Sequence, residues 1–155
     1  IAQAMKQATR KLTALDTNVL ARYYVQAEQA DAATTAQCAQ ARALLESGKP
    51  LFVATTVALE LEWVLRGFYK LKPKTVAAVF MHLLEMPHLQ VQDRHALQSA
   101  CDALTQGFDF ADALHHASSR HCDVFATFDT KGFAKCASAH PWTPKVQALT
   151  STPFT

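Results

Sequence analysis

The chain has 155 residues, of which half are apolar and 18% are charged; this composition excludes an intrinsically disordered protein and leaves room for one domain with a hydrophobic core. Because the formal net charge is only +2, any affinity for nucleic acid must come from a local basic patch. No apolar stretch approaches the roughly 20 residues of a membrane span, and the four cysteines show neither C-x-x-C spacing nor a disulfide framework. We therefore expect a cytoplasmic protein with free thiols and no membrane association.

Short apolar runs typical of buried strands alternate along the chain with segments of helical periodicity. In chain order, the predicted elements are a strand at 12–16, a helix at 18–25, a helix from 34 or 35 to 46, a strand at 51–54, a helix at 55–69, a helix at 73–86, a strand at 89–92, a helix at 94–105, a helix at 109–121, a strand at 123–128, a helix at 130–136 and a strand at 144–149. Thr34 or Thr35 is expected to cap the second helix, and Thr55 or Thr56 the third, because a hydroxyl accepts a free N–H of the first turn.

This alternation predicts an α/β fold whose parallel sheet is covered by helices on both faces. We expect one domain over residues 12–149, with an N-terminal extension at residues 1–11 and a C-terminal tail at residues 150–155. Functional sites in such sheets gather at the carboxyl ends of the strands. Asp16 and Asp129 each end an apolar run, so they meet at that edge if their strands are neighbours.

Several carboxylates lie among apolar residues at the ends of strands or the beginnings of helices. Burying them singly is costly, because desolvation favours the neutral form of an acid. A divalent cation such as Mg²⁺ neutralises a group of carboxylates together through oxygen ligands. The candidates for such a group are Asp16, Glu60, Asp112 and Asp129. Each of them alone also suits a simpler role as a helix cap or turn residue.

In two places the candidate had to be chosen from a pair of acids that lie close together in the sequence. Glu62 and Arg66 have the order and spacing of a surface ion pair on a helix, so Glu62 is interpreted as solvated and Glu60, which has no basic neighbour at those offsets, as the metal candidate. Asp109 is interpreted as the cap of the helix in which Asp112 occupies the first turn, close to the sheet.

Neutral groups that could support the acids lie beside them in the sequence. Thr17 and Asn18 follow Asp16 directly and offer neutral hydrogen-bonding groups that could orient a ligating carboxylate. Thr127 lies two residues before Asp129, so both side chains point the same way from a strand. Thr127 could hold a water molecule or a carboxylate.

Taken together, four segments resemble the PIN-domain ribonucleases, and among those they look most like the VapC toxins of bacterial toxin–antitoxin pairs. The segments are LDTNVLARYY, TTVALELEWVLRGFY, DFADALHHA and ATFDTKGF, and they cover about residues 12 to 136. The resemblance implies a three-layer α/β/α sandwich with a central parallel sheet. It also implies an acidic cluster that binds Mg²⁺ or Mn²⁺, formed by Asp16, Glu60, Asp112 and Asp129 and supported by Asn18 and Thr127.

The expected activity is metal-dependent hydrolysis of an RNA phosphodiester. A divalent metal lowers the pKa of a bound water and offsets the charge of the phosphate, and Glu60 or Asp129 could accept the proton of that water. The resemblance implies products with a 5′-phosphate and a 3′-hydroxyl. Because an acidic pocket repels RNA, cations are needed at its rim, and Arg22 and Lys131 are the candidates for phosphate contacts.

The family resemblance further implies structured RNA as substrate (tRNA or ribosomal RNA), a homodimer, and a cognate antitoxin through which any contact with DNA is made. The antitoxin would pack a helix into an apolar groove; Trp63, Phe68 and Tyr69 could line it, although we interpret them as core residues. One alternative is a largely non-catalytic partner in a DNA-binding repressor complex. Another is a phosphoacceptor domain in which one aspartate is phosphorylated, which the helical glutamate suits poorly.

Overall fold

A computed structural model describes residues 11–137 and 139–149 of the chain. The predicted N-terminal extension, apart from Lys11, and the predicted tail at 150–155 lie outside the described residues. The chain divides into two compact units. The N-terminal unit contains residues 11–70 and 82–92, and the C-terminal unit contains residues 71–81 and the chain from residue 93 onward. Within the described ranges, no helix combines the length and apolar character needed to cross a bilayer.

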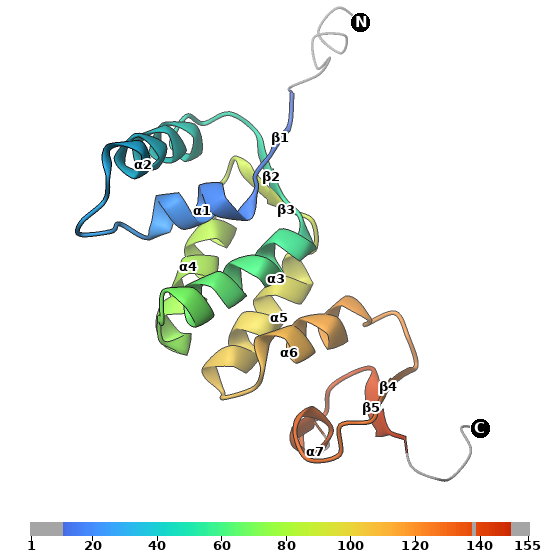
Figure 1. Cartoon of the computed structure of the whole chain (residues 1–155). Coiled ribbons are helices and arrows are strands. Elements are labelled where there is room, and N and C mark those ends of the chain that lie inside the picture. Colours follow the sequence, from blue (N-terminus) through green and yellow to red (C-terminus); the bar gives the residue numbers. More distant parts are fainter. Residues whose placement is uncertain (1–10, 138, 150–155) are drawn as a thin grey trace, which may run out of the picture. The chain divides into compact units, whose positions relative to one another are not determined.

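The N-terminal unit is built on a small parallel sheet with strand order β1-β2-β3 (Figure 1). The strands are β1 (Thr13–Ala14), β2 (Leu51–Val53) and β3 (Leu89–Val91). In register, Leu51 lies opposite Thr13 on one side and Leu89 on the other. The side chains of Leu51 and Val53 are fully buried, so the central strand forms the core of this unit, as expected for a strand covered on both faces.

Three α-helices and a π-helical turn complete the N-terminal unit. They are α1 (Thr17–Tyr24), α2 (Ala32–Leu45), α3 (Thr55–Trp63) and the π-helical segment η2 (Val64–Phe68). Helix α1 packs against both α2 and α3. The single helix predicted over residues 55–69 is therefore α-helical only in its first part and changes to π geometry at Val64.

The predicted helix caps in this unit are wrong. Helix α2 begins earlier than predicted and is capped by Asp31, whose Oδ1 accepts the N–H of Thr34 at 2.7 Å. A carboxylate three residues before that N–H has the reach of an N-cap, which places Thr34 inside the first turn. Helix α3 has Ala54 at its N-cap position and no side-chain cap. The backbone N–H of Thr55 is instead bound by the side-chain oxygen of Gln92, at 3.0 Å.

The C-terminal unit contains a helical hairpin and a second parallel sheet. Its elements are the first part of α4 (Pro73–Glu85), α5 (Arg94–Thr105), α6 (Phe110–Ser118), β4 (Val124–Thr127), α7 (Phe133–Ala137) and β5 (Lys145–Ala148). Strands β4 and β5 pair in parallel, with Val124 opposite Lys145. The rings of Phe80 and Phe110 stack with centroids 5.2 Å apart, and both side chains are buried.

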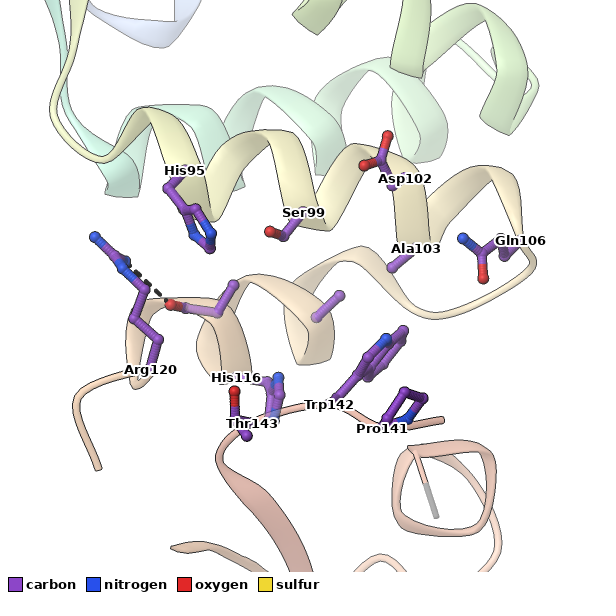
Figure 2. Close-up of a pocket in the computed structure, with 12 residues that line it drawn as sticks. His95, Ser99, Asp102, Ala103, Gln106, His116, Arg120, Pro141, Trp142 and Thr143 are labelled. Atoms are coloured by element: carbon purple, nitrogen blue, oxygen red, sulfur yellow. Dashed lines mark hydrogen bonds between the residues drawn. The ribbon is translucent and has the colours of Figure 1, made fainter. Parts of the chain in front are cut away.

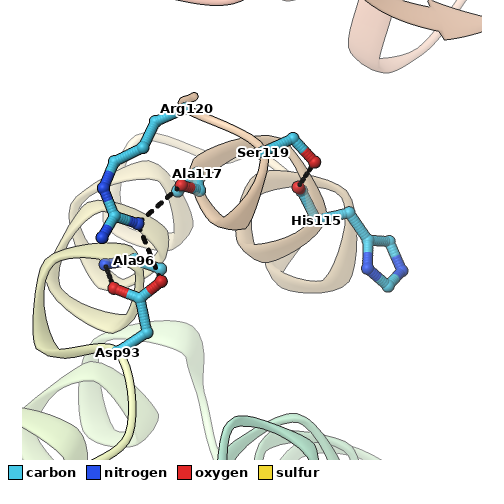
Figure 3. Close-up of polar contacts among 6 residues, drawn as sticks. All are labelled: Asp93, Ala96, His115, Ala117, Ser119 and Arg120. Atoms are coloured by element: carbon cyan, nitrogen blue, oxygen red, sulfur yellow. Dashed lines mark hydrogen bonds and ion pairs between the residues drawn. The ribbon is translucent and has the colours of Figure 1, made fainter. Parts of the chain in front are cut away.

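An ion pair closes the open end of the α5–α6 hairpin (Figure 3). Asp93 caps α5 by accepting the Ala96 N–H at Oδ1 (3.0 Å), and its Oδ2 pairs with Nη1 of Arg120 at 2.7 Å. The same Nη1 donates to the carbonyl of Ala117 at 3.2 Å. One aspartate therefore joins the beginning of α5 to the end of α6.

The predicted α/β class with parallel strands is confirmed, and each predicted strand lies within one residue or two of an observed one. The strands are divided between two sheets, one in each unit. Strands β1 and β4, which precede Asp16 and Asp129, belong to different sheets. The sheet pairing therefore does not make these two aspartates neighbours at one edge.

Candidate functional site

Asp16 lies where β1 leads into α1. The N–H of Leu15 donates to the Phe52 carbonyl at 2.9 Å, which extends the pairing of β1 with β2 up to this point. Asp16 then caps α1, with its Oδ1 accepting the Thr17 N–H at 2.8 Å. The carboxylate is exposed, as is Asn18 in the first turn of α1. Asp16 thus acts as a cap while its remaining oxygen stays open to a ligand.

A buried hydroxyl lies directly beside Asp16 in the chain. Thr17 is only 4% exposed, and its Oγ1 has no hydrogen-bond partner among the described residues. Buried polar atoms in folded proteins are normally hydrogen-bonded, and an exception calls for an unseen partner such as a water or an ion. Thr17 was expected only to help orient the Asp16 carboxylate; that its hydroxyl is buried and without a partner among the described residues could not be recognised from the sequence.

Glu60 and Glu62 on α3 have opposite environments. Glu60 is exposed and takes part in no ion pair among the described residues. Glu62 is 3% exposed and its Oε1 contacts Nε of Arg66 at 2.6 Å. The predicted Glu62–Arg66 pair is confirmed, but the prediction that Glu62 is solvated is wrong. Glu62 lies on the helix face of Ala58 and Leu65, at the spacings of four and three residues, and both are buried.

Asp112 lies in the first turn of α6, and Asp109 is the cap of that helix, as predicted. The Asp109 Oδ1 accepts the N–H of Asp112 at 3.0 Å. Burial raises the pKa of the half-buried Asp112 carboxyl, and the charges of Asp109 and Asp129 raise this pKa further, against a smaller lowering by His115. Two acids from separate motifs, Asp112 and Asp129, therefore interact electrostatically within the C-terminal unit.

Asp129 is held by the backbone that follows it. Its Oδ1 accepts the N–H groups of Lys131 (3.1 Å) and Gly132 (2.7 Å), and its Oδ2 accepts that of Phe133 (3.0 Å). These hydrogen bonds lower the pKa of the Asp129 carboxyl, led by those from Gly132 and Phe133. The Asp129 N–H donates in turn to Oγ1 of Thr127 at 3.0 Å. The Thr127 hydroxyl therefore supports Asp129 by binding the backbone N–H of Asp129.

Gly132 is a site residue that the sequence reasoning missed. A Cβ atom added at this position would lie 2.5 Å from Oδ2 of Asp129, which is closer than non-bonded atoms can approach. Only glycine therefore allows the Asp129 carboxylate to reach these backbone N–H groups. The D-x-x-G spacing at Asp129 was the available signal in the sequence.

The four predicted acids are divided equally between the two units. Asp16 and Glu60 belong to the N-terminal unit, whereas Asp112 and Asp129 belong to the C-terminal unit. Within the described part of either unit, no group of three or more His, Cys, Asp or Glu side chains lies together in a way that could hold a metal ion. That all four acids share one cation therefore stays a prediction.

The carboxylates predicted as ligands in each unit are chemically suited to a divalent cation. Carboxylate oxygens are the ligands that Mg²⁺ and Mn²⁺ prefer. Burial and, further, the charges of Asp109 and Asp129 raise the pKa of Asp112, and a bound cation would offset the repulsion among these carboxylates. The residues that could hold it are Asp112 and Asp129 in one unit and Asp16 and Glu60 in the other.

The two residues predicted to contact phosphate, Arg22 and Lys131, have different surroundings. Nε of Arg22 donates to Oε1 of Gln37 at 3.0 Å, and its Nη1 donates to the Tyr69 hydroxyl at 3.3 Å. Arg22 and Asn18 line a cavity of about 450 Å³ between α1 and α2. Both partners of Arg22 are neutral, so its positive charge is not cancelled by them. Lys131 is exposed beside Asp129.

The aromatic residues near the end of α3 are not core residues, contrary to the prediction. Trp63 is 63% exposed and Phe68 is 72% exposed, while Tyr69 is half-buried and holds Arg22. Large apolar side chains that are exposed together often mark an interaction surface.

Comparison with protein families finds a match to the PIN domain over residues 13–138. Comparisons with curated proteins and with solved structures gave no significant match. The matched range contains all four acids and all four segments on which the resemblance was based. PIN domains are generally nucleases, and they typically use divalent metals. Because the match covers most of the sequence, the chain belongs to the PIN domain family.

Proposed function

We propose that this PIN domain is a Mg²⁺- or Mn²⁺-dependent endoribonuclease and the toxin of a VapBC-type toxin–antitoxin pair. The observation that carries the proposal is the half-buried Asp112 carboxyl, whose pKa is raised first by burial and further by the charges of Asp109 and Asp129 that crowd it. Acids whose pKa is shifted by burial and like charges occur preferentially at functional sites. In a metal-dependent nuclease such crowding has a functional explanation, because a bound cation would offset the repulsion among the carboxylates.

Asp16 and Asp112 would be the principal ligands, with Glu60 and Asp129 binding directly or through water. The divalent metal, when bound, would lower the pKa of a water molecule and offset the negative charge of the phosphate. Of the two candidate proton acceptors, Glu60 is favoured by its surroundings. Asp129 is a weaker base, because three backbone N–H groups stabilise its ionised form. Glu60 is exposed and can pass a proton to solvent.

The substrate we propose is structured RNA, namely tRNA or ribosomal RNA. Arg22 and Lys131 would contact phosphates at the rim of the acidic site, which orients the strand without reading its sequence. Their positions support this role, because Arg22 lines a cavity with Asn18 and Lys131 directly follows Asp129 and Thr130. Exposed loops rather than duplex regions would be cut, since the bases of single strands are accessible.

The proposed partners are a second copy of the chain and a cognate antitoxin, through which any contact with DNA would be made. An antitoxin helix would cover Trp63 and Phe68, the exposed aromatic residues at the end of α3 and in η2. Such a helix would carry apolar side chains at regular spacing along the face that contacts these two residues. We propose that the complex forms in the cytoplasm, that residues 12–149 form one domain, and that residues 1–11 and 150–155 are peripheral to it.

The test is cleavage of a tRNA and ribosomal RNA mixture by the purified chain with and without Mg²⁺. We expect Asp112→Asn and Asp16→Asn to lose cleavage and the exposed control Glu85→Gln to retain it. Equal cleavage by Asp112→Asn and the parent would overturn the nuclease assignment. An inactive parent that still binds its antitoxin would favour the alternative, a non-catalytic partner in a repressor complex.

A second measurement reports on the metal without relying on activity. Ligand that binds only the folded state raises the melting temperature. Mg²⁺ should therefore stabilise the parent more than Asp112→Asn, while Glu85→Gln responds like the parent. An identical Mg²⁺ response in the parent and Asp112→Asn would remove Asp112 from the metal site.

A further inference from the structure

A cavity of about 350 Å³ lies within the C-terminal unit, between α5, α6 and the segment at 141–143 (Figure 2). Ala113 and Ala117 of α6 line it, and their small side chains leave room that a larger residue would fill. Ala113 directly follows Asp112, so the cavity begins beside the acidic end of α6. Its volume lies near the lower limit of natural small-ligand pockets, about 300–1,000 Å³.

One end of the cavity is aromatic. The Trp142 ring projects from the loop toward α6 and lies at the same end of the cavity as Gln106 (Figure 2). The ring is held by its neighbours, with centroid distances of 4.6 Å to Phe108 and 5.2 Å to His140. Trp142 is nevertheless only half-buried. It therefore offers a rigid, partly open aromatic face, as base-stacking platforms do.

The wall contributed by α5 and the residue after it is polar. Ser99 and Asp102 of α5, together with Gln106 directly after this helix, line the cavity (Figure 2). A hydroxyl and a primary amide each donate and accept hydrogen bonds. Such groups match the mixed donor and acceptor edge of a nucleobase, which an apolar ligand lacks.

The opposite end of the cavity carries a guanidinium and an imidazole. Arg120 and His95 line it there (Figure 2). The described contacts of the Arg120 guanidinium to Asp93 and to the Ala117 carbonyl both involve Nη1. A guanidinium has five N–H donors, so the anchored Arg120 retains others with which to bind a phosphate oxygen.

We propose that this cavity binds one unstacked nucleotide of the RNA substrate, with its base against Trp142 and its phosphate toward Arg120. The proposal rests on the proposed ribonuclease function only for the identity of RNA as the source of the nucleotide. Because Ala113, which lines the cavity, directly follows Asp112 in the chain, the bound base would be a determinant of which RNA loop is cut. Stacking of the base on Trp142 and hydrogen bonds from Gln106 and Arg120 together would hold the nucleotide.

Trp142 itself provides the assay. The chain has two tryptophans, and Trp63→Phe leaves Trp142 as the single tryptophan, which is excited selectively at the red edge of its absorption, at little structural cost because Trp63 is exposed. The full chain with this substitution is titrated in EDTA with AMP, GMP, CMP and UMP, and separately with inorganic phosphate. We expect saturable quenching by at least one nucleotide and none by phosphate.

Two further substitutions in that background locate the binding. Gln106→Ala should weaken nucleotide binding about tenfold, the value of one hydrogen bond of about 1.4 kcal/mol. Gln98→Ala is the matched control, an exposed glutamine of α5 that does not line the cavity. Equal affinities of these two variants would overturn the proposal, as would quenching by phosphate alone or no quenching by any nucleotide.

The absence of divalent metal separates this inference from the nuclease assignment. RNA cleavage with no nucleotide response would overturn the pocket and leave the ribonuclease standing. If the chain cuts no RNA but shows a saturable nucleotide response that Gln106→Ala weakens, the pocket stands and the ribonuclease assignment is overturned.

Discussion

Removing the partner of the buried Glu62 carboxylate should destabilise the N-terminal unit. Glu62 is 3% exposed and contacts Arg66 at 2.6 Å, while the Arg66 side chain is 46% exposed. A hydrogen bond to a charged group contributes about 1.5–3 kcal/mol, and breaking a fully buried pair costs about 3–5 kcal/mol. Because Arg66 is partly solvated, we expect Arg66→Met to lower the free energy of unfolding by about 2 kcal/mol.

The double variant Glu62→Gln/Arg66→Met gives the sharper result. It contains no buried unpaired charge, so it should be more stable than Arg66→Met alone by about 1 kcal/mol, although it carries one more substitution. Urea unfolding of the full chain, followed by far-ultraviolet circular dichroism, measures these differences. Arg42→Met on the exposed face of α2 is the control and should change stability by less than about 0.5 kcal/mol. A double variant no more stable than Arg66→Met would refute the reasoning.

Three further predictions concern the C-terminal unit. Asp112→Asn should stabilise the metal-free chain at neutral pH, because a raised folded-state pKa makes the ionised form unfavourable; thermal melts should show this gain vanish as the pH falls below about 4. Gly132→Ala should disrupt the backbone cap of Asp129 and lower RNA cleavage without abolishing folding; parent-like cleavage would contradict this role. Burial raises the pKa of Asp93, but hydrogen bonds from Arg120 and the Ala96 N–H lower it more. Its ionised form therefore stabilises the fold above about pH 4, and Asp93→Ala should cost about 1 kcal/mol at neutral pH but little in acid, as urea titrations at both pH values would reveal.

Features that depend on neighbours in the sequence were predicted well. The strands and most helix positions follow from hydrophobic periodicity, which reflects the geometry of each element. The cap formed by Asp109 and the pair of Glu62 with Arg66 span three and four residues, so both could be recognised from spacing alone. The order of the four acidic segments was likewise sufficient to indicate the PIN family.

Features that depend on which helix face is covered were not predictable in the same way. Glu62 is buried and Trp63 and Phe68 are exposed, the reverse of what side-chain polarity suggests. The helix that carries them is nearly uniform in apolar character, so its periodicity does not identify the buried face. Packing decided which face is buried. The cap of α2 by the exposed Asp31, three residues before Thr34, is by contrast a local feature that spacing could have indicated.

The acids show the same division. The sequence alone determined which carboxylates are candidates, since Asp112 and Asp129 each lie in a segment typical of the family. Only the tertiary structure decided that burial and the approach of Asp129 raise the pKa of Asp112. The pKa of Asp129 is lowered by backbone N–H donors that follow it within four residues, a local feature to which the D-x-x-G spacing points. The two acids differ because the ionised form of an acid is disfavoured by burial and nearby carboxylates and favoured by backbone N–H donors. Folding brings Asp129 close to Asp112, and spacing along the chain does not specify that approach.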